Sequence, residues 1–443
     1  MAGAYALDLR DDWYIIPISL LVKKQAFSLQ VKGQTPLPAD SFGVILKAMP
    51  RVKKDAKLID ELLSRRVAKI FPSQNVLARL LRQRKIRLYQ GFDPTGKLHI
   101  GNGIGLKLLM EFANAGHEVI FLFGTGTVLV GDPSQREGGR IEITAREINN
   151  YINGWRKQAA KIVDFKKIKI KQNADWLTKL TLKDIIGIAS KLSAVQLFKR
   201  DSFQRRLNKG DTVWYHETMY PLLQGYDSVV MDVDLEIGGT DQEFNMLVGR
   251  ELMKKMKNKD KYVLTLPLIL GTDGQKMSAS KGNCVWMDDP ANEMYGKLMS
   301  VPDSQTMPYL KLCTDVPEDE LKSLAKANPR DAKARMAYEI TKLYHGAQVA
   351  GQAAKHFDAQ FKKGDVPTNV AEYKRKQGKV AIHDLVVETG LAESRSEARR
   401  LVEQGGVKID GKVCQTNDLV NLRPACPVLL QVGKRKFKRL STK

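Results

Sequence analysis

The sequence predicts an α/β fold: a Rossmann-like domain with a doubly wound parallel sheet, followed by an α-helical domain and a small α+β module. Between residues 86 and 267, short apolar runs of strand length alternate with longer runs that have helical periodicity, which is typical of a parallel sheet. Glycine-rich loops follow the strand-like runs, at the positions where open α/β sheets bind ligands. After Pro290 the strand signals fade and helical periodicity continues.

The 443 residues are enough for several domains, and shifts in composition divide them into five segments. Residues 1–48 show no sustained periodicity, and we expect an accessory extension or an upstream start that is not used. The Rossmann-like domain is expected at 49–290 and the helical domain at 291–362. Residues 363–378 are polar, with Pro and Gly, as is typical of a linker. The α+β module follows at 379–443.

The first predicted element is an amphipathic helix after Met49, with apolar residues at helical spacing from Leu58 to Ile70. The strands of the Rossmann-like domain are expected at Ile86–Gln90, Val119–Phe123, Lys167–Asn173, Val233–Ile237 and Val263–Pro267, and one helix contains Tyr220–Val229. Later helices are expected at Asn292–Met299, at Glu318–Ala327 and from Arg330 to about Phe361. In the module, the pattern predicts helices at Ile382–Glu388 and Ser394–Glu403, and strands at Val407–Ile409, Val413 and Val428–Val432.

The stretch from Tyr89 to Gly105, YQGFDPTGKLHIGNGIG, runs from a strand through a glycine-containing turn into a helix. This arrangement directs backbone N–H groups and the positive end of a helix dipole toward phosphate. GFDPTGKL has the spacing of a P-loop, but Leu98 stands where that motif needs a magnesium-binding hydroxyl. GNGIG resembles half of a dinucleotide fingerprint, with its third glycine at the wrong offset. HIGN, at His99–Asn102, is the third interpretation, and alone it also fits an ordinary strand-to-helix turn.

The composition favours a polyanionic partner. Lys plus Arg number 72 and Asp plus Glu 49, which gives a net charge of +23, although a generally basic proteome produces the same excess. The four cysteines form no C-x-x-C pair, which argues against a zinc site, and their sparse use fits a reducing cytoplasm. No apolar run is long enough to span a membrane. The run Trp13–Val22 is short, broken by Pro17 and preceded by acidic residues, unlike a secretory signal.

A second signature, Lys276–Ser280 (KMSAS), lies in a glycine-rich loop after the last predicted strand. A mobile loop with a lysine and hydroxyls can close over a triphosphate and stabilise charge on leaving pyrophosphate. HIGN resembles the HIGH signature of class I aminoacyl-tRNA synthetases, and KMSAS resembles their KMSKS signature. With YQGFDPT, VGDPS, YPLLQGYD and GGTDQ, they make the chain after Met49 similar to tyrosyl-tRNA synthetases of the bacterial type. Residues 291–362 then resemble that family's anticodon-binding domain, and LAESRSEARRLVEQGGVKIDGKVC resembles an S4 RNA-binding module.

The resemblance implies a tyrosine–tRNA ligase that activates L-tyrosine with ATP, releases pyrophosphate, and transfers tyrosine to the 3′ end of tRNA(Tyr) for translation. It assigns Tyr89 and Asp227 to the substrate phenol. Phenylalanine would leave both groups unpaired, an effect for which this enzyme class is the standard example. The other implied tyrosine-binding residues, at the ammonium end or where the backbone approaches closely, are Tyr220, Gln224, Asp132, Gln242 and Gly91. Tyr220, Gln224 and Asp227 follow one another at spacings of four and three, on one face of a helix.

The resemblance also implies an ATP site. Its implied residues are Asp93 and Thr95 in the turn, His99 and Asn102 at the helix start, Gly239 and the ribose-binding Asp241, and Lys276 and Ser278 in the mobile loop; Arg136 and Arg140 would contact pyrophosphate. Magnesium is expected on the triphosphate of ATP, and no permanent cofactor. The tyrosine carboxylate would attack the α-phosphate in line, so that catalysis rests on positioning and charge neutralisation.

Two positions depart from the family pattern, and two other functions stay open. Asn102 replaces the final His of HIGH, and Ala279 replaces the second Lys of KMSKS, with Lys281 as a candidate substitute. Tryptophanyl-tRNA synthetase shares the fold and signatures, but Tyr89 and Asp227 suit a phenol. A non-catalytic RNA-binding protein on this fold, for example an intron-splicing cofactor, conflicts with the retained signature residues. The resemblance finally implies a cytoplasmic homodimer with no membrane association.

Overall fold

The computed structural model describes residues 52–132, 144–362, 370–422, 427–433 and 436–442. Within these ranges the central sheet has six strands in the order β1–β6–β5–β2–β3–β4. They are β1 (Lys69–Phe71), β2 (Arg87–Phe92), β3 (Glu118–Phe123), β4 (Lys169–Gln172), β5 (Leu235–Gly239) and β6 (Tyr262–Leu266). All neighbouring strands are parallel except β1, which pairs antiparallel with β6. The predicted doubly wound parallel sheet is therefore confirmed, with one antiparallel strand at its edge.

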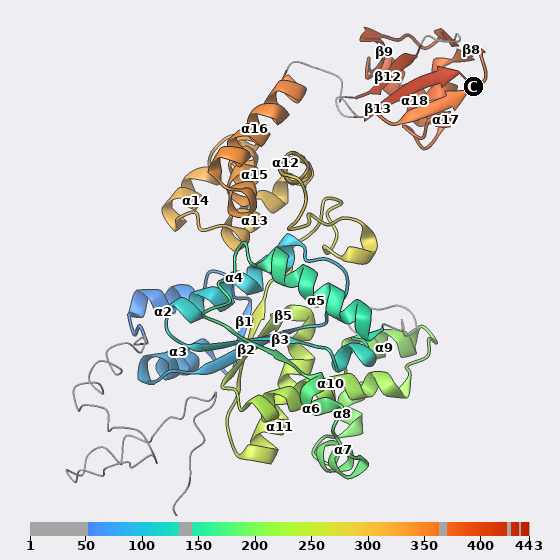
Figure 1. Ribbon diagram of the computed structural model, residues 1–443. Helices are drawn as coiled ribbons and strands as arrows, with labels where there is room; N and C mark the ends of the chain where they lie inside the picture. The colour runs from blue at the N-terminus through green and yellow to red at the C-terminus, as the bar shows by residue number, and fades with distance from the viewer. Residues whose placement is uncertain (1–51, 133–143, 363–369, 423–426, 434–435, 443) are drawn as a thin grey trace, which may run out of the picture. The chain divides into compact units, whose positions relative to one another are not determined.

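Helices cover both faces of this sheet (Figure 1). α4 (Ile100–Asn114) and α5 (Ala145–Ala159) lie on one face, and α10 (Tyr215–Met231) and α11 (Glu243–Lys257) lie on the other. Between β4 and α10 the chain forms the short helices α6 (Ala174–Leu177), α7 (Leu182–Ala189), α8 (Ala194–Phe198) and α9 (Asp201–Asn208). Because β3 and β5 flank β2 on opposite sides, the strand order reverses at β2. Open α/β sheets bind ligands at such a point, outside the carboxyl ends of the strands.

The first described helix is shorter than the sequence predicts. α2 spans Ala56–Leu62, with the Asp55 side chain accepting from the Leu58 N–H as its N-cap, and α3 spans Gln74–Gln83. Ile70, the last apolar position of the predicted helix, lies in β1 instead. The prediction was wrong because a short apolar spacing fits a helix or a strand equally well, and the open edge of β6 supplies the strand partner.

Two glycines let α10 and α11 approach each other closely. A Cβ added to Gly225 would lie 3.1 Å from the Gly249 backbone, and one added to Gly249 would lie 2.5 Å from Lys261 Nζ. Neither position therefore accepts a larger side chain without rearrangement. This packing keeps α10 close enough to the sheet for Gln224 to hydrogen-bond Glu236 of β5 at 3.0 Å.

The helical domain begins after the last loop of the Rossmann-like domain. Its helices are α12 (Ala291–Ser300), α13 (Thr306–Cys313), α14 (Glu318–Leu324), α15 (Pro329–His345) and α16 (Ala347–Lys362). The predicted single helix from Arg330 to about Phe361 is thus two helices. Gly346 separates them with a φ of 84°, a left-handed value that ends α15. Among the described residues, no helix is both long and apolar enough to cross a membrane.

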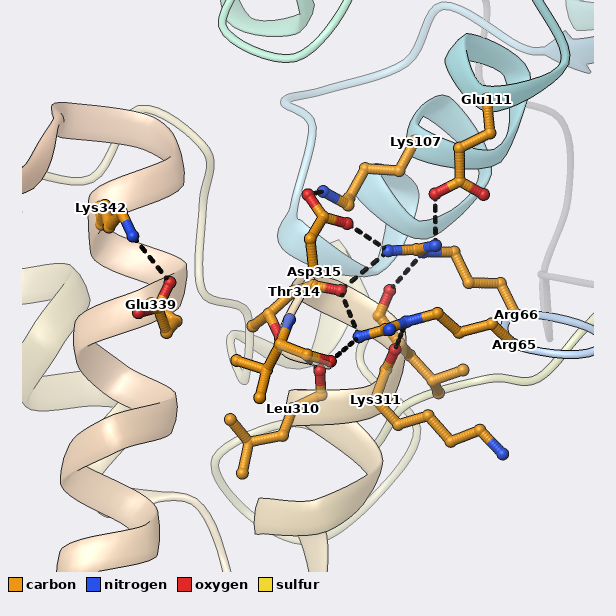
Figure 2. A network of polar contacts seen from close by, with 12 residues as sticks. Arg65, Arg66, Lys107, Glu111, Leu310, Lys311, Thr314, Asp315, Glu339 and Lys342 are labelled. Atoms are coloured by element: carbon orange, nitrogen blue, oxygen red, sulfur yellow. Dashed lines mark hydrogen bonds and ion pairs between the residues drawn. The ribbon is translucent and has the colours of Figure 1, made fainter. Parts of the chain in front are cut away.

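A pair of arginines between α2 and β1 joins the helical domain to this part of the Rossmann-like domain and to α4 (Figure 2). Arg65 and Arg66 donate to the carbonyl oxygens of Lys311, Leu312, Thr314 and Val316, at 2.7–3.0 Å. Arg66 also binds Glu111 of α4 and Asp315, and Lys107 of α4 binds Asp315 at 2.7 Å. The last carbonyls of a helix have no partner within it, so the arginines satisfy the end of α13. The helical domain is thereby anchored on the helix that begins at HIGN.

The C-terminal module has its own sheets and core. Its strands are β7 (Glu372–Arg375), β8 (Gly378–Ala381), β9 (Val407–Ile409), β10 (Lys412–Val413), β11 (Leu419–Leu422), β12 (Val428–Val432) and β13 (Lys436–Thr442). They form a sheet in the order β10–β9–β12–β13–β7 and a β11–β8 pair, packed with α17 (Ile382–Glu388) and α18 (Arg395–Glu403). β7 lies within the predicted linker and pairs parallel with β13. Its short, polar sequence EYKR carries little strand signal.

Candidate active site

The predicted site residues in the described ranges lie at or near the carboxyl ends of neighbouring strands. Tyr89 and Gly91 belong to β2, with Asp93 and Thr95 just after it; Asp132 follows β3; Gly239 ends β5, with Asp241 and Gln242 just after it; Lys276 and Ser278 follow β6. Tyr220, Gln224 and Asp227 come from α10 beside the sheet. Arg136 and Arg140 fall outside the described residues.

The two signature segments are held side by side by backbone pairing. His99 forms an isolated antiparallel bridge with Trp286, just after the KMSAS loop. The Ile100 N–H donates to the Val285 carbonyl and the Met287 N–H to the Leu98 carbonyl, each at 3.0 Å. Although nearly 180 residues apart in sequence, HIGN and the base of the KMSAS loop therefore share one short ladder.

Asn102 caps the helix that HIGN begins. Its Oδ1 accepts the His99 backbone N–H at 3.0 Å, and its own N–H donates to the His99 carbonyl at 2.9 Å. The amide therefore takes over the local task of fixing the start of α4 and keeps its Nδ2 group as a donor. Asn102 departs from the HIGH pattern without loss of a polar group at the turn.

His99 is a neutral imidazole at physiological pH. Burial, helped by the Lys276 ammonium, lowers the pKa of His99 to about 4. The ring lies over Gly101, where an added Cβ would be 2.9 Å from His99 Nδ1. Among the described residues, Nδ1 is a buried nitrogen with no hydrogen-bond partner. A neutral ring still offers one N–H, so His99 can donate a hydrogen bond to phosphate without carrying a charge.

The KMSAS loop carries two lysines with different partners. Lys276 Nζ lies 2.9 Å from Asp241 Oδ2, so the signature lysine reaches the residue expected to bind ribose. Lys281 Nζ donates to Gln275 Oε1 at 2.7 Å within the loop. Asn283 braces the loop, because it accepts from the Ser278 N–H at 2.9 Å and donates to the Lys276 carbonyl at 3.1 Å.

Asp227 is a buried acid held by two donors. Its side chain is 2% exposed; Trp176 Nε1 donates to Oδ1 at 2.8 Å and Asn173 Nδ2 donates to Oδ2 at 3.0 Å. Burial raises the pKa of Asp227 to about 8, against these two hydrogen bonds, which favour the ionised form. The carboxyl therefore changes its protonation state close to neutral pH.

Tyr89 belongs to a buried polar network. Its hydroxyl lies 2.9 Å from Ser228 Oγ, which in turn lies 3.4 Å from Glu236 Oε2. Burial, followed by the nearby Glu236 and Asp227 carboxylates, raises the pKa of Tyr89 well above its usual value. The phenol of Tyr89 is therefore a neutral group that can both donate and accept.

The residues assigned to the ammonium end and to ATP contact one another. Tyr220 donates to Asp93 Oδ2 at 2.9 Å, and Thr127 donates to Asp93 Oδ1 at 2.8 Å. Asp132 accepts from Gln242 Nε2 at 2.6 Å and pairs with the buried Arg200 at 3.4 Å. The first of these contacts links α10 to the turn after β2.

The sequence did not single out several polar residues of this site. They are Asn173, Trp176, Thr127, Arg200, Ser228, Glu236 and Lys261. A usable signal existed for Glu236, because a charged residue within an apolar, buried strand run needs a partner. Asn173 directly follows β4, at the edge where ligands bind.

Comparison with known proteins places the site in a family. The family of class I tRNA synthetases (W and Y) matches residues 81–362, and the S4 domain family matches residues 382–422. A tyrosine–tRNA ligase of Thermotoga maritima is 40% identical over 390 residues, which cover 86% of this chain and 96% of that protein. A tyrosine–tRNA ligase of Moorella thermoacetica is 37% identical over 416 residues, 91% of this chain and 99% of that protein.

Solved structures agree on the fold. A C-terminally truncated mitochondrial tyrosyl-tRNA synthetase of Aspergillus nidulans superposes with a TM-score of 0.59 at 21% identity, over 72% of this chain and 98% of that one. A tyrosyl-tRNA synthetase of Archaeoglobus fulgidus complexed with L-tyrosine gives a TM-score of 0.54 at 21% identity, over 68% of this chain and 100% of that one. By its family models and by identity over nearly the whole length of its relatives, the chain belongs to the tyrosine–tRNA ligases, class I tRNA synthetases with a C-terminal S4 domain.

Proposed function

We infer that the chain activates L-tyrosine with ATP to tyrosyl-adenylate and then transfers tyrosine to tRNA(Tyr), as its family membership indicates. The observation that carries this assignment is the backbone ladder that holds HIGN beside the KMSAS loop, in a sheet whose neighbouring helix carries the buried acid Asp227. Incubation of the chain with ATP, labelled tyrosine and a tRNA(Tyr) transcript tests it. We expect tyrosyl-tRNA, and no charging of a transcript whose identity is for another amino acid.

We propose that Tyr89 and Asp227 recognise the phenol of the substrate. Both are buried, and each has hydrogen-bonding capacity beyond its contacts within the protein that a phenol can use and phenylalanine cannot. The desolvation cost of such unpaired groups is the reason for discrimination, which tyrosyl-tRNA synthetases exemplify. Tyr220, Gln224, Asp132 and Gln242 would surround the ammonium group, and Gly91 would let the backbone of β2 approach the substrate.

We expect tyrosine binding to release a proton near neutral pH. With a pKa of about 8, Asp227 is mostly protonated at pH 7 in the free pocket, whereas acceptance of the phenol O–H needs the carboxylate. The affinity for tyrosine should therefore rise toward pH 8, by up to about tenfold per pH unit, and level off above it. Calorimetric titration at pH 7 in buffers of different ionisation enthalpy measures the proton released.

The Asp227→Asn variant is the control for this proton. An amide has no proton to lose in this range, so the release should vanish together with the rise in affinity. Full proton release in the variant would assign the titration to another group and contradict the role of Asp227.

We propose that the ATP site is formed by the two signatures and the turn after β2. Asn102, His99 and Thr95 would donate to the phosphates, and Asp241 would bind the ribose hydroxyls, with Gly239 allowing close approach. Lys276 and Ser278, with Arg136 and Arg140, would neutralise the charge on pyrophosphate. Magnesium would accompany ATP as part of the substrate.

We propose a cytoplasmic homodimer whose interface is the apolar surface on α7, α8, α9 and the start of α10. The exposed large apolar residues of this surface are Leu182, Ile186, Val195, Phe198, Leu207, Trp214 and Tyr215. Large apolar side chains exposed on successive helices in this way favour an interface. The cytoplasmic setting is supported by the buried free thiols of Cys284, Cys313 and Cys414.

A charge placed in this surface should separate the subunits. Tyr215 is 84% exposed, so Tyr215→Asp should leave the fold of the subunit intact. We expect light scattering to report half the mass of the unmodified enzyme, because a buried unpaired carboxylate opposes association. Val349→Asp, at an exposed apolar position on α16, should stay dimeric. An unchanged mass for Tyr215→Asp would contradict the proposed interface.

A further inference from the structure

A buried ion pair lies behind the proposed tyrosine pocket and takes no part in the proposed chemistry. Glu236 of β5 is 2% exposed and Lys261, just before β6, is fully buried. Lys261 Nζ binds Glu236 Oε2 and donates to the Met246 carbonyl at 3.1 Å. A buried charge pair is costly unless its remaining atoms are satisfied. The other contacts of Glu236 therefore matter.

The remaining contacts of Glu236 lead to the tyrosine site. Gln224 Nε2 donates to Glu236 Oε1 at 3.0 Å, and Ser228 Oγ lies 3.4 Å from Glu236 Oε2. Ser228 Oγ lies 2.9 Å from the Tyr89 hydroxyl. One carboxylate thus contacts Gln224, expected at the ammonium end, and reaches Tyr89, expected at the phenol end, through one hydroxyl.

The contact with Gln224 fixes which end of its amide is available. Because a carboxylate accepts hydrogen bonds and cannot donate them, it holds the Nε2 end of Gln224 and turns the Oε1 end away. Among the described residues, Gln224 Oε1 is a buried acceptor with no hydrogen-bond partner. A buried acceptor without a partner is costly in the free protein. The α-ammonium group of tyrosine supplies three N–H donors that can satisfy it.

Ser228 connects Glu236 to the hydroxyl of Tyr89. Ser228 is fully buried on α10, and its hydroxyl bridges the Glu236 carboxylate and the Tyr89 phenol. This bridge fixes the position of the Tyr89 hydroxyl from behind the pocket. Lys261 keeps Glu236 in place, since Gly249 leaves room for its ammonium group.

We propose that Glu236, held by Lys261, is a positioning residue for tyrosine that orients Gln224 and, through Ser228, Tyr89. This inference rests on the proposed function of the site. Glu236 does not touch the substrate. Its role is to turn the oxygen of Gln224 toward the ammonium group and to fix the hydroxyl of Tyr89, so its loss should affect tyrosine and spare ATP.

The Glu236→Gln variant tests this role in the tyrosine-dependent exchange of pyrophosphate into ATP. The substituted amide keeps the shape, but its one oxygen cannot serve both the Gln224 side and the Lys261 side, so one of them meets an NH2 group. We expect KM for tyrosine to rise about 10- to 100-fold, the effect of losing a hydrogen bond to a charged group. KM for ATP should stay within about twofold, kcat should change less than KM for tyrosine, and the preference for tyrosine over phenylalanine should fall.

Asp234→Asn is the matched control. Asp234 precedes β5, is buried, and pairs with Arg84 and Lys259 without contact to the pocket residues. The Asp234→Asn variant therefore shows how neutralising a buried, paired acid changes thermal stability when no pocket residue is involved. We expect its KM for tyrosine to stay within about twofold of the unmodified enzyme, whatever happens to its thermal midpoint.

The double variant Glu236→Gln, Lys261→Met separates positioning from stability. It leaves neither charge unpaired, so it should recover thermal stability that the single variant lacks. A raised KM for tyrosine that persists in the double variant supports positioning. Recovery of KM together with stability, or an unchanged KM in Glu236→Gln, overturns it. Absence of tyrosine-dependent exchange in the unmodified enzyme would instead contradict the proposed function itself.

Discussion

Lys276→Ala is expected to slow tyrosine activation by about 10²- to 10³-fold, the usual effect of removing one group that stabilises charge in the transition state. The Lys276 ammonium lies 2.9 Å from Asp241 Oδ2 in a loop whose base is paired to HIGN. In the proposed site, ribose would take up Asp241 and free this lysine to stabilise the charge on pyrophosphate. Pyrophosphate exchange measures the rate, and equilibrium dialysis measures tyrosine binding, which should change little because Lys276 does not contact the tyrosine pocket.

Lys281→Ala is the matched control for this variant. Lys281 lies in the same loop, but its ammonium group is bonded to Gln275. Its removal should reduce the exchange rate only slightly, which would also exclude it as the substitute for the missing second lysine at Ala279. Unchanged exchange kinetics in Lys276→Ala would refute the assignment of the KMSAS lysine.

Removal of the C-terminal module is expected to spare tyrosyl-adenylate formation and to weaken tRNA charging, with KM for tRNA raised about 10- to 100-fold. The proposed catalytic residues lie in another part of the chain, whereas the S4 domain is expected to contact RNA phosphates. The predicted boundary at residue 379 would leave β7 behind, although β7 pairs with β13 of the module. The cleaner truncation ends at Lys362, the last residue of α16.

Salt dependence is the control for the truncated enzyme. For each RNA phosphate that the truncated enzyme no longer binds, the log–log slope of tRNA affinity against salt should become shallower by nearly one unit. Exchange kinetics measured in parallel should match those of the full chain. An equal loss of exchange and charging would contradict the modular organisation, since it would mean that the module supports the catalytic domain.

The sequence predicted the fold because its signals are local and repeated. Strand runs such as Val119–Phe123 and the glycine-containing turns at their ends follow directly from side-chain period and turn chemistry. HIGN and KMSAS each follow a strand. Because the carboxyl ends of parallel strands lie at one edge of the sheet, the sequence placed both signatures at that edge. Those properties reside in consecutive residues, so they are visible without the tertiary structure.

The buried network behind the pocket was not predictable in this way. Ser228 and Glu236 are eight residues apart in sequence, and Lys261 is 25 residues beyond Glu236. They meet only because Gly225 and Gly249 bring α10 and α11 together and because β5 lies next to β6. The cap that Asn102 provides depends on the conformation at the start of α4. Similarly, β7 is recognisable only once β13 supplies its partner.

Amino-acid-dependent exchange of pyrophosphate into ATP, run with tyrosine, phenylalanine and tryptophan, tests the central assignment most directly. The buried pair Tyr89 and Asp227 predicts exchange with tyrosine and a rate lower by several orders of magnitude with phenylalanine, because each unpaired buried group costs about 1–3 kcal/mol or more. Tryptophan should support none. Exchange driven by tryptophan, or no exchange with any of the three, would contradict the account.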